Sequence, residues 1–171
     1  MQITTRTIGD VSLITMDDEK KNAITPEAIA DLDAALDRAE AESAAVVLAG
    51  RPGAFCAGFD LSIMGSGDKE AILGLAKGGG ELAVRLWSFP KPLVAACTGH
   101  AFTIGAIWLC TCDTRVGERG PFKIGMTETR MGMTFTPWAL EPLSHRLSTQ
   151  HWIASIVQAR VHDPDGALEA G

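Results

Sequence analysis

Apolar residues along the chain form four strand-like segments. Residues 2–8 and 11–16 alternate in part between β-branched and polar side chains, and a glycine–aspartate pair separates them, which predicts a hairpin. Residues 44–50 and 93–98 are instead continuous apolar runs, which is typical of strands that are buried on both faces. The chain is therefore predicted to have two kinds of strand: a half-exposed pair that forms a hairpin, and two strands that are fully buried.

Three helical segments alternate with these strands. Thr25 is a favoured N-cap residue and Pro26 a favoured first helical residue, and apolar side chains then recur every three or four positions as far as residue 39. Residues 68–88 form a second helical pattern, which the glycine run 78–80 weakens in its middle. Residues 102–112 are apolar almost all round and predict a buried helix. The segment from Pro137 onward has a less regular helical pattern.

The alternation of buried strands and helices predicts an α/β fold with parallel strand pairs. In such folds ligands bind beyond the carboxyl ends of the strands, which places two candidate sites after residues 50 and 98. The first is the small-sided bend "GAFCAGFDL", residues 53–61. Backbone N–H groups are its most available polar groups, so it could bind a negative oxygen, or it could be a plain strand-to-helix turn with Asp60 as N-cap.

Composition narrows the function further. The chain has 171 residues and a net charge of −6, which suits one domain and disfavours nucleic acid as a partner. No leader sequence is evident and no apolar run approaches the roughly 18 residues of a membrane span, so we expect a cytoplasmic protein without membrane contact. The four cysteines lack metal-ligand spacing, and we expect buried, reduced thiols and no metal.

Three longer segments carry a resemblance to a known family. "RPGAFCAGFDL", "KPLVAACTGHAFTIGAIWLCTCD" and "FKIGMTETRMGM" are similar, in this order, to the signature blocks of the crotonase (enoyl-CoA hydratase/isomerase) superfamily. "KKNAIT" and "PDGALEAG" resemble two further blocks near the two ends of the chain. The resemblance implies the ClpP/crotonase-like fold, a repeated ββα superhelix with stacked short sheets, and an enzyme that stabilises an enolate of an acyl-CoA thioester.

The resemblance also implies roles for individual residues. The two oxyanion-binding N–H groups fall on Phe59 and on Ile104, the middle residue of a triplet that is usually Gly-Gly-Gly in the family. A backbone N–H survives any side chain except proline, so the second donor can persist on isoleucine. The bend around Ala57 and Gly58 would line the track of the CoA adenine and pantetheine, with Asp60 at its end.

The acid/base residues of the family are only half present. Hydratases of the family usually carry two glutamates, and the first of these positions is Ile107 in this chain. The second matches Glu128. Because moving a double bond from the 3- to the 2-position needs one carboxylate, whereas hydration also needs an activated water, the favoured reaction is Δ3-to-Δ2 enoyl-CoA isomerisation.

Other residues have weaker assignments. Lys21, next to Asn22 and Ala23, is a candidate for a CoA phosphate or an ordinary solvated lysine. His100 lies beside the second corner, as a base, a pocket wall or a structural histidine. Asp113 ends the buried helix, and the family resemblance suggests that it tethers a strand.

Three alternatives remain open. A hydratase, thioester hydrolase or dehalogenase would keep the family and change the reaction. A catalytically inactive acyl-CoA-binding protein would leave Glu128 without a chemical role. A serine protease of the related Clp type would use Ser62 and His100, but the residues around Ser62 do not match that family.

The resemblance implies an assembly as well. We expect residues 1–171 to form a single crotonase-like core domain that lacks the C-terminal helical segment with which family members build trimers. Self-association as a trimer or a hexamer is expected on the same ground. No cofactor is expected other than the coenzyme A that is part of the substrate.

Overall fold

The computed structural model describes residues 1–171 and has a five-stranded sheet at one end. Its strands are β1 (Gln2–Ile8), β2 (Val11–Asp17), β4 (Ala45–Ala49), β7 (Leu93–Cys97) and β9 (Thr114–Gly117), in the order β1-β2-β4-β7-β9. The predicted hairpin is confirmed, since β1 pairs antiparallel with β2, and every other pair in the sheet is parallel.

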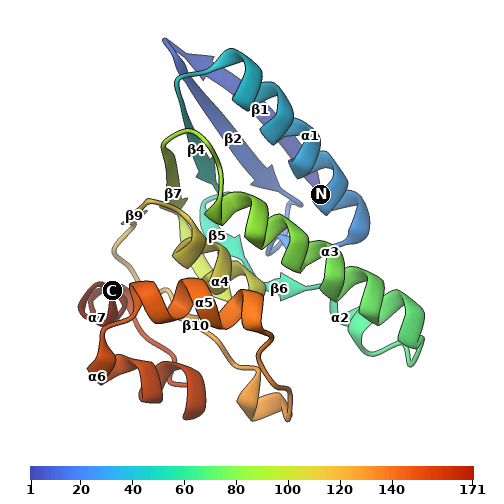
Figure 1. Ribbon diagram of the computed structural model, residues 1–171, viewed down its shortest axis with the longest axis vertical. Helices are drawn as coiled ribbons and strands as arrows, with labels where there is room; N and C mark the ends of the chain where they lie inside the picture. Colours follow the sequence, from blue (N-terminus) through green and yellow to red (C-terminus); the bar gives the residue numbers. More distant parts are fainter.

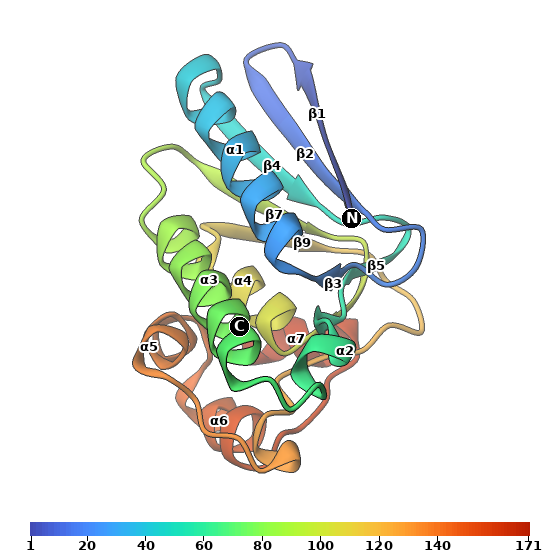
Figure 2. The same ribbon diagram turned by 90° about the vertical axis from the view of Figure 1, so that its right-hand side faces the viewer.

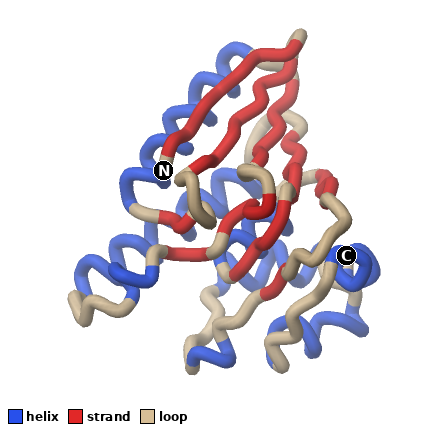
Figure 3. The backbone as a smooth tube through the Cα atoms, turned by 180° about the vertical axis from the view of Figure 1, so that it is seen from behind, coloured by secondary structure: helices blue, strands red, loops and turns tan.

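Two smaller sheets lie below the large one (Figure 3). One has the order β10-β8-β5 and the other pairs β3 with β6; their strands are β3 (Ala23–Ile24), β5 (Gly53–Cys56), β6 (Gly58–Phe59), β8 (Gly99–Phe102) and β10 (Ile124–Gly125). After β1, each strand of the large sheet is followed along the chain by a short strand in a smaller sheet. This repeat confirms the stacked short sheets of the crotonase fold.

Seven α-helices surround the sheets: α1 (Pro26–Glu42), α2 (Leu61–Met64), α3 (Lys69–Trp87), α4 (Ile104–Thr111), α5 (Pro137–Arg146), α6 (Thr149–Trp152) and α7 (Pro164–Ala170). α1 and α3 lie along one side of the strands, and α5, α6 and α7 gather at the opposite end from the hairpin (Figures 1 and 2). Thr25 caps α1 as predicted, because its side chain accepts the Ala28 N–H at 3.2 Å. None of these helices is both long and apolar enough to cross a bilayer.

The sequence patterns differ from the structure at three places. α3 runs unbroken through Gly78–Gly80. The buried helix begins at Ile104 because Phe102 still belongs to β8 and Thr103 has a φ of 49°. The bend at residues 53–61 contains β5 and β6 and leads into the short helix α2, with Asp60 as its N-cap.

The core has two parts that meet at α4. A cluster of 23 buried residues fills the space between the large sheet, α1 and α3, and a cluster of 7 lies between α4, β10 and the C-terminal helices. Trp138 and Ile124 pack against both clusters. Asp113, at the end of α4, accepts the Leu93 N–H at 2.9 Å, so the expected tether between this helix and β7 is confirmed.

The carbonyl end of α4 is covered by two arginines. Arg146 donates to the carbonyl oxygens of Cys110 and Cys112, at 3.2 and 3.1 Å, and Arg115 donates to that of Cys112 at 3.1 Å. Cationic groups at this end of a helix satisfy its last carbonyls and oppose its dipole. This fully buried helix is therefore held by charge at its C-terminus while its N-terminus faces a cavity.

Candidate active site

A cavity of about 650 Å³ lies beside the N-terminus of α4. Its walls are mostly apolar and come from β6, α2, α4, α5 and the segment 127–136. Five of the residues singled out in the sequence line it together: Ala57, Phe59, Ile104, Ile107 and Glu128. Large aromatic and methionine side chains complete the wall: Met64, Phe102, Met131, Met133, Phe135 and Trp138. An apolar cavity of this size with few polar groups is typical of a small-molecule site.

Close backbone packing brings the two predicted corners together. A Cβ on Gly58 would lie 2.3 Å from Thr103 Oγ1, so only glycine, at φ 105°, fits there. A Cβ on Gly105 would lie 2.6 Å from the carbonyl oxygen of Cys56. Small residues at both positions therefore allow the strand β6 and the start of α4 to touch.

The N–H groups of Phe59 and Ile104 are not used by the elements that contain them. In the parallel pair β3–β6, Ile24 accepts the Asp60 N–H at 2.9 Å, and the alternation of a parallel ladder turns the Phe59 N–H away from β3. The hydrogen bonds of α4 begin with Ile107, whose N–H donates to the Thr103 carbonyl at 3.0 Å. Ile104 precedes that bond, in the first turn where helical N–H groups lack partners.

Glu128 is the sole ionisable side chain among the residues that line the cavity. It is only 8% exposed, and its Oε2 has no hydrogen-bond partner. Burial raises the pKa of this carboxyl above its ordinary value, although a hydrogen bond from its own backbone N–H opposes the rise. Such an unpaired group costs folding free energy and is therefore a strong indication of a functional site.

The backbone around Glu128 is fixed by a short turn. The Glu128 carbonyl accepts the N–H groups of Met131 and Met133, at 2.9 and 3.0 Å, at the start of the 3-10 helix Thr129–Met131. Gly132 ends this turn at φ 71°, in the left-handed region. The backbone at Glu128 is thus fixed by local structure, and its carboxyl shares the cavity lining with the buried Ile107 of α4.

Five other residues from the sequence lie outside the lining of this cavity. Lys21 is exposed, and its carbonyl accepts the Ala57 N–H at 2.9 Å; Ala23 pairs with the buried Gly58. The Asp60 carboxylate accepts the N–H groups at the start of α2. His100 accepts the Lys123 N–H on its Nδ1 at 3.0 Å and lies between two phenylalanine rings.

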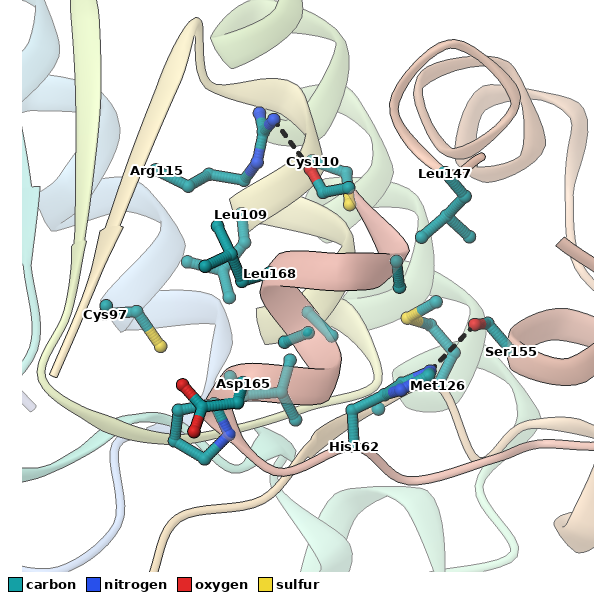
Figure 4. Close-up of a pocket in the computed structure, with 18 of the residues that line it drawn as sticks. Cys97, Leu109, Cys110, Arg115, Met126, Leu147, Ser155, His162, Asp165 and Leu168 are labelled. Carbon is teal, nitrogen blue, oxygen red and sulfur yellow. Dashed lines mark hydrogen bonds between the residues drawn. The ribbon is translucent and has the colours of Figure 1, made fainter. Parts of the chain in front are cut away.

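A second cavity, of about 260 Å³, lies next to α4 near its carbonyl end (Figure 4). It contains none of the predicted site residues. Three polar contacts join residues of its lining: Ser155 Oγ with His162 Nε2 at 2.9 Å, Arg115 with the Gly171 carbonyl at 2.9 Å, and Arg119 with Asp165 at 3.2 Å. Cys110 lies in its wall, and burial raises the pKa of this thiol to about 11. The walls are otherwise largely apolar, and no group of three or more metal-ligating side chains occurs in the protein.

Sequence reasoning missed the structural roles of two residues, one that ties β2 to β5 and one that lines the first cavity. Asn22 is fully buried, and its side-chain amide donates to three carbonyls, those of Met16, Ala54 and Phe55. Thr103 lines the cavity with φ 49° and ψ −120°, a conformation that β-branched residues rarely adopt. The sequence shows that Thr103 replaces the usual first glycine of the triplet, but only the structure shows the backbone conformation of Thr103.

Comparisons with known proteins agree with this geometry. A family model described as enoyl-CoA hydratase/isomerase matches residues 6–171. A putative enoyl-CoA hydratase of Thermus thermophilus is 35% identical over 133 residues, which cover 72% of this chain and 51% of that protein. Human mitochondrial enoyl-CoA delta isomerase 1 is 27% identical over 154 residues, or 88% of this chain and 51% of that protein. The chain spans about half the length of these curated relatives.

Solved structures are similar over almost all of the chain. The crystal structure of an enoyl-CoA hydratase/isomerase family protein from Pseudomonas syringae superimposes with a TM-score of 0.94 at 38% identity, covering 99% of this chain and 73% of that one. A protein of Mycobacterium tuberculosis, described in one crystal structure as an enoyl-CoA isomerase and in another as a probable enoyl-CoA hydratase, gives TM-scores of 0.92 at 36% identity and 0.94 at 37% identity, each covering 99% of this chain and 74% and 72% of that one.

Proposed function

The chain belongs to the enoyl-CoA hydratase/isomerase family, and on this premise we propose that it shifts the double bond of 3-enoyl-CoA thioesters to the 2-position. One observation carries the proposal. Glu128 is a buried carboxyl whose Oε2 has no hydrogen-bond partner, in a cavity lined by no second ionisable side chain. A single acid/base next to two backbone donors suffices for an isomerase and lacks what a hydratase needs.

The first step is the formation of an enolate. The N–H groups of Phe59 and Ile104 donate to the thioester oxygen, and the Glu128 carboxylate removes a proton from C2. The electrons of the C2–H bond form a C1–C2 double bond while the oxygen becomes negative. Each well-placed donor to such an oxygen contributes roughly 3–4 kcal/mol to transition-state stabilisation.

The second step returns the proton. Glu128 donates it to C4, the former C3–C4 double bond becomes a C2–C3 double bond, and the thioester carbonyl re-forms. No atom is gained or lost. The raised pKa of Glu128 suits both steps, because a carboxyl that titrates closer to neutral pH is an effective base and then an effective acid.

Hydration of 2-enoyl-CoA is disfavoured by Ile107. This residue is 3% exposed and occupies the wall of the cavity where family hydratases carry their other glutamate. An alkyl side chain cannot take a proton from water, so no water is activated on that side of the substrate. This argument supports isomerisation over the hydratase alternative.

The remaining predicted residues are assigned to the coenzyme A part of the substrate. Ala57 and Gly58, with Ala23 across the β3–β6 pair, would line its path toward the surface. Asp60 and His100 would act through the backbone that they hold, at the start of α2 and at Lys123 just before β10, respectively. Lys21 is exposed and free to meet a phosphate. Assembly as a trimer or a hexamer is part of the same proposal and rests on the family alone.

The test is an assay of 3-enoyl-CoA and 2-enoyl-CoA with the wild type and Glu128→Gln. The amide keeps the size of the side chain and removes its proton-accepting charge, so isomerisation should fall by about 10²-fold or more. Glu118→Gln, which changes an exposed carboxylate, is the matched control and should keep full activity. Fast hydration by the wild type would contradict the reaction, and an active Glu128→Gln would contradict the residue.

One alternative function has an observation in its favour. Ile107, where hydratases carry a glutamate, also fits a protein that binds acyl-CoA without reacting. In that case neither substrate would turn over, and titration calorimetry would still detect binding of a saturated acyl-CoA. Absence of binding as well would refute both functions.

A further inference from the structure

Two neighbouring glycines of α3 are in contact with aromatic rings. A Cβ on Gly79 would lie 2.5 Å from Cε1 of Phe59, and a Cβ on Gly80 would lie 2.6 Å from Cε2 of Trp138. Real Cβ atoms do not approach other atoms so closely. Both rings therefore rest directly on the helix backbone, in space that any other residue would fill.

Other glycines of the same helix have no such contacts. A Cβ on Gly74 would meet nothing within 4 Å, and one on Gly78 would make an ordinary contact with Ile29 at 3.4 Å. Glycine is unfavourable in the middle of a helix, yet α3 continues through all of them. The pair at 79 and 80 thus has a packing reason that Gly74 lacks.

The two rings also wall the cavity of the candidate active site. Phe59 carries one of the two donor N–H groups, and Trp138 lines the cavity from the first turn of α5. The Trp108 indole N–H donates to the Gly79 carbonyl at 3.4 Å, which joins α3 to α4 at the same level. A side chain added at either glycine would therefore move a ring that forms a wall of the site.

We propose that Gly79 and Gly80 form a seat on α3, meaning a flat surface of helix backbone on which the rings of Phe59 and Trp138 pack. This seat positions two walls of the cavity and thereby determines the length of the acyl chains that the cavity accepts. The inference rests on the proposed function for the nature of the ligand. Gly80 is a specificity-determining residue that acts through Trp138, and Gly79 is a positioning residue that acts through the Phe59 backbone. Neither touches the reacting atoms.

The two positions should respond differently to alanine. In Gly80→Ala, the added methyl displaces the indole away from α3, and the wall that Trp138 forms in the cavity changes shape. The KM for 3-dodecenoyl-CoA should then rise roughly tenfold, the effect of about one methylene in an apolar pocket, while 3-hexenoyl-CoA keeps its KM. In Gly79→Ala, the shift of Phe59 should lower kcat for both substrates alike.

Gly74→Ala is the matched control, because it makes the same change on the same helix where nothing is in contact. Its kinetics should equal those of the wild type. The double variant Gly80→Ala/Trp138→Phe supplies the rescue, since the smaller ring leaves room for the methyl. It should restore the KM for 3-dodecenoyl-CoA, and it should restore folding if Gly80→Ala alone does not fold.

A spectroscopic measurement separates this inference from the proposed function. With fluorotryptophan incorporated, the ¹⁹F resonance of Trp138, assigned by its loss in Trp138→Phe, should shift in Gly80→Ala and stay in place in Gly74→Ala, whatever the enzyme turns over. An unmoved resonance, an unchanged ratio of the two KM values in an active Gly80→Ala, or a double variant without rescue would overturn the seat. Lack of turnover by the wild type would instead refute the proposed function.

Discussion

Replacing Glu128 with glutamine should stabilise the protein, and the gain should depend on pH. The carboxyl is 8% exposed and one of its oxygens has no partner. Leaving a buried polar group unsatisfied costs about 1–3 kcal/mol, and more when it is charged. The amide in Glu128→Gln also lacks a hydrogen-bond partner at this position but carries no charge. The difference between the free energies of unfolding of the two proteins therefore isolates the cost of ionising the carboxyl.

The direction follows from the raised pKa of Glu128 in the folded state. Between the unfolded value, near 4.5, and the higher folded value, the folded protein holds more protons than the unfolded chain. Its free energy of unfolding therefore falls as pH rises through this window and levels off above the folded pKa. Below the unfolded value, wild type and Glu128→Gln should be about equally stable, and at neutral pH the variant should be more stable by about 1–3 kcal/mol.

Urea unfolding of both proteins at several pH values from 4 to 8 measures this difference. Other titrating groups are shared and cancel when the two curves are subtracted. Glu118→Gln, on an exposed carboxylate, is the control and should give a flat difference. A difference for Glu128→Gln that stays constant over the whole range would refute the reasoning, because the carboxyl would then ionise as easily in the folded state as in the unfolded chain.

Four further substitutions test the scaffold by the same unfolding measurement. Asn22→Ala removes the donor for three buried carbonyls and should lower the free energy of unfolding by about 2–3 kcal/mol. A loss of only about 0.5 kcal/mol, as for an ordinary surface mutation, would contradict that network. Gly105→Ala forces a methyl to 2.6 Å from the Cys56 carbonyl oxygen and should cost about 1–3 kcal/mol, whereas Gly74→Ala should gain about 0.5–1 kcal/mol in open space. Arg85→Ala separates α3 from acidic side chains of α1 and should cost about 1 kcal/mol at low salt and less at high salt; an unchanged salt dependence would argue against the ion pairs.

Local patterns in the sequence predicted much of the fold. Thr25 and Pro26 specify the start of α1 through groups that lie next to each other in the chain. The apolar runs predicted the strands β4 and β7, although in each strand one face is buried and the other is largely half-buried rather than fully covered. Signals of this kind need no knowledge of distant contacts, and they were confirmed to within one or two residues.

The parts that could not be predicted depend on distant contacts. The glycine run of α3 lowers helix propensity, and only the position of Trp138, far along the chain, explains why glycine is required at residue 80. Likewise, the closeness of Phe59 and Ile104 comes from the contact between Gly58 and Thr103, which no spacing in the sequence indicates. Glu128 was recognised from its motif, but the absence of a hydrogen-bond partner for its Oε2 is visible only in three dimensions.

The division of the core at α4 determines which parts of the molecule open first. The larger cluster joins the five-stranded sheet to α1 and α3, whereas α5 and its neighbours rest on a cluster of only 7 buried residues. Sub-global opening follows the weaker boundary, so backbone amides of α5 should exchange with deuterium sooner than those of β4. Because Trp138 packs against both clusters and lines the cavity of the candidate active site, each such opening should also expose this cavity to solvent. We therefore predict that this layer also controls access to the cavity, so that, on the proposed function, the rate at which a bulky thioester enters or leaves depends on a local unfolding equilibrium.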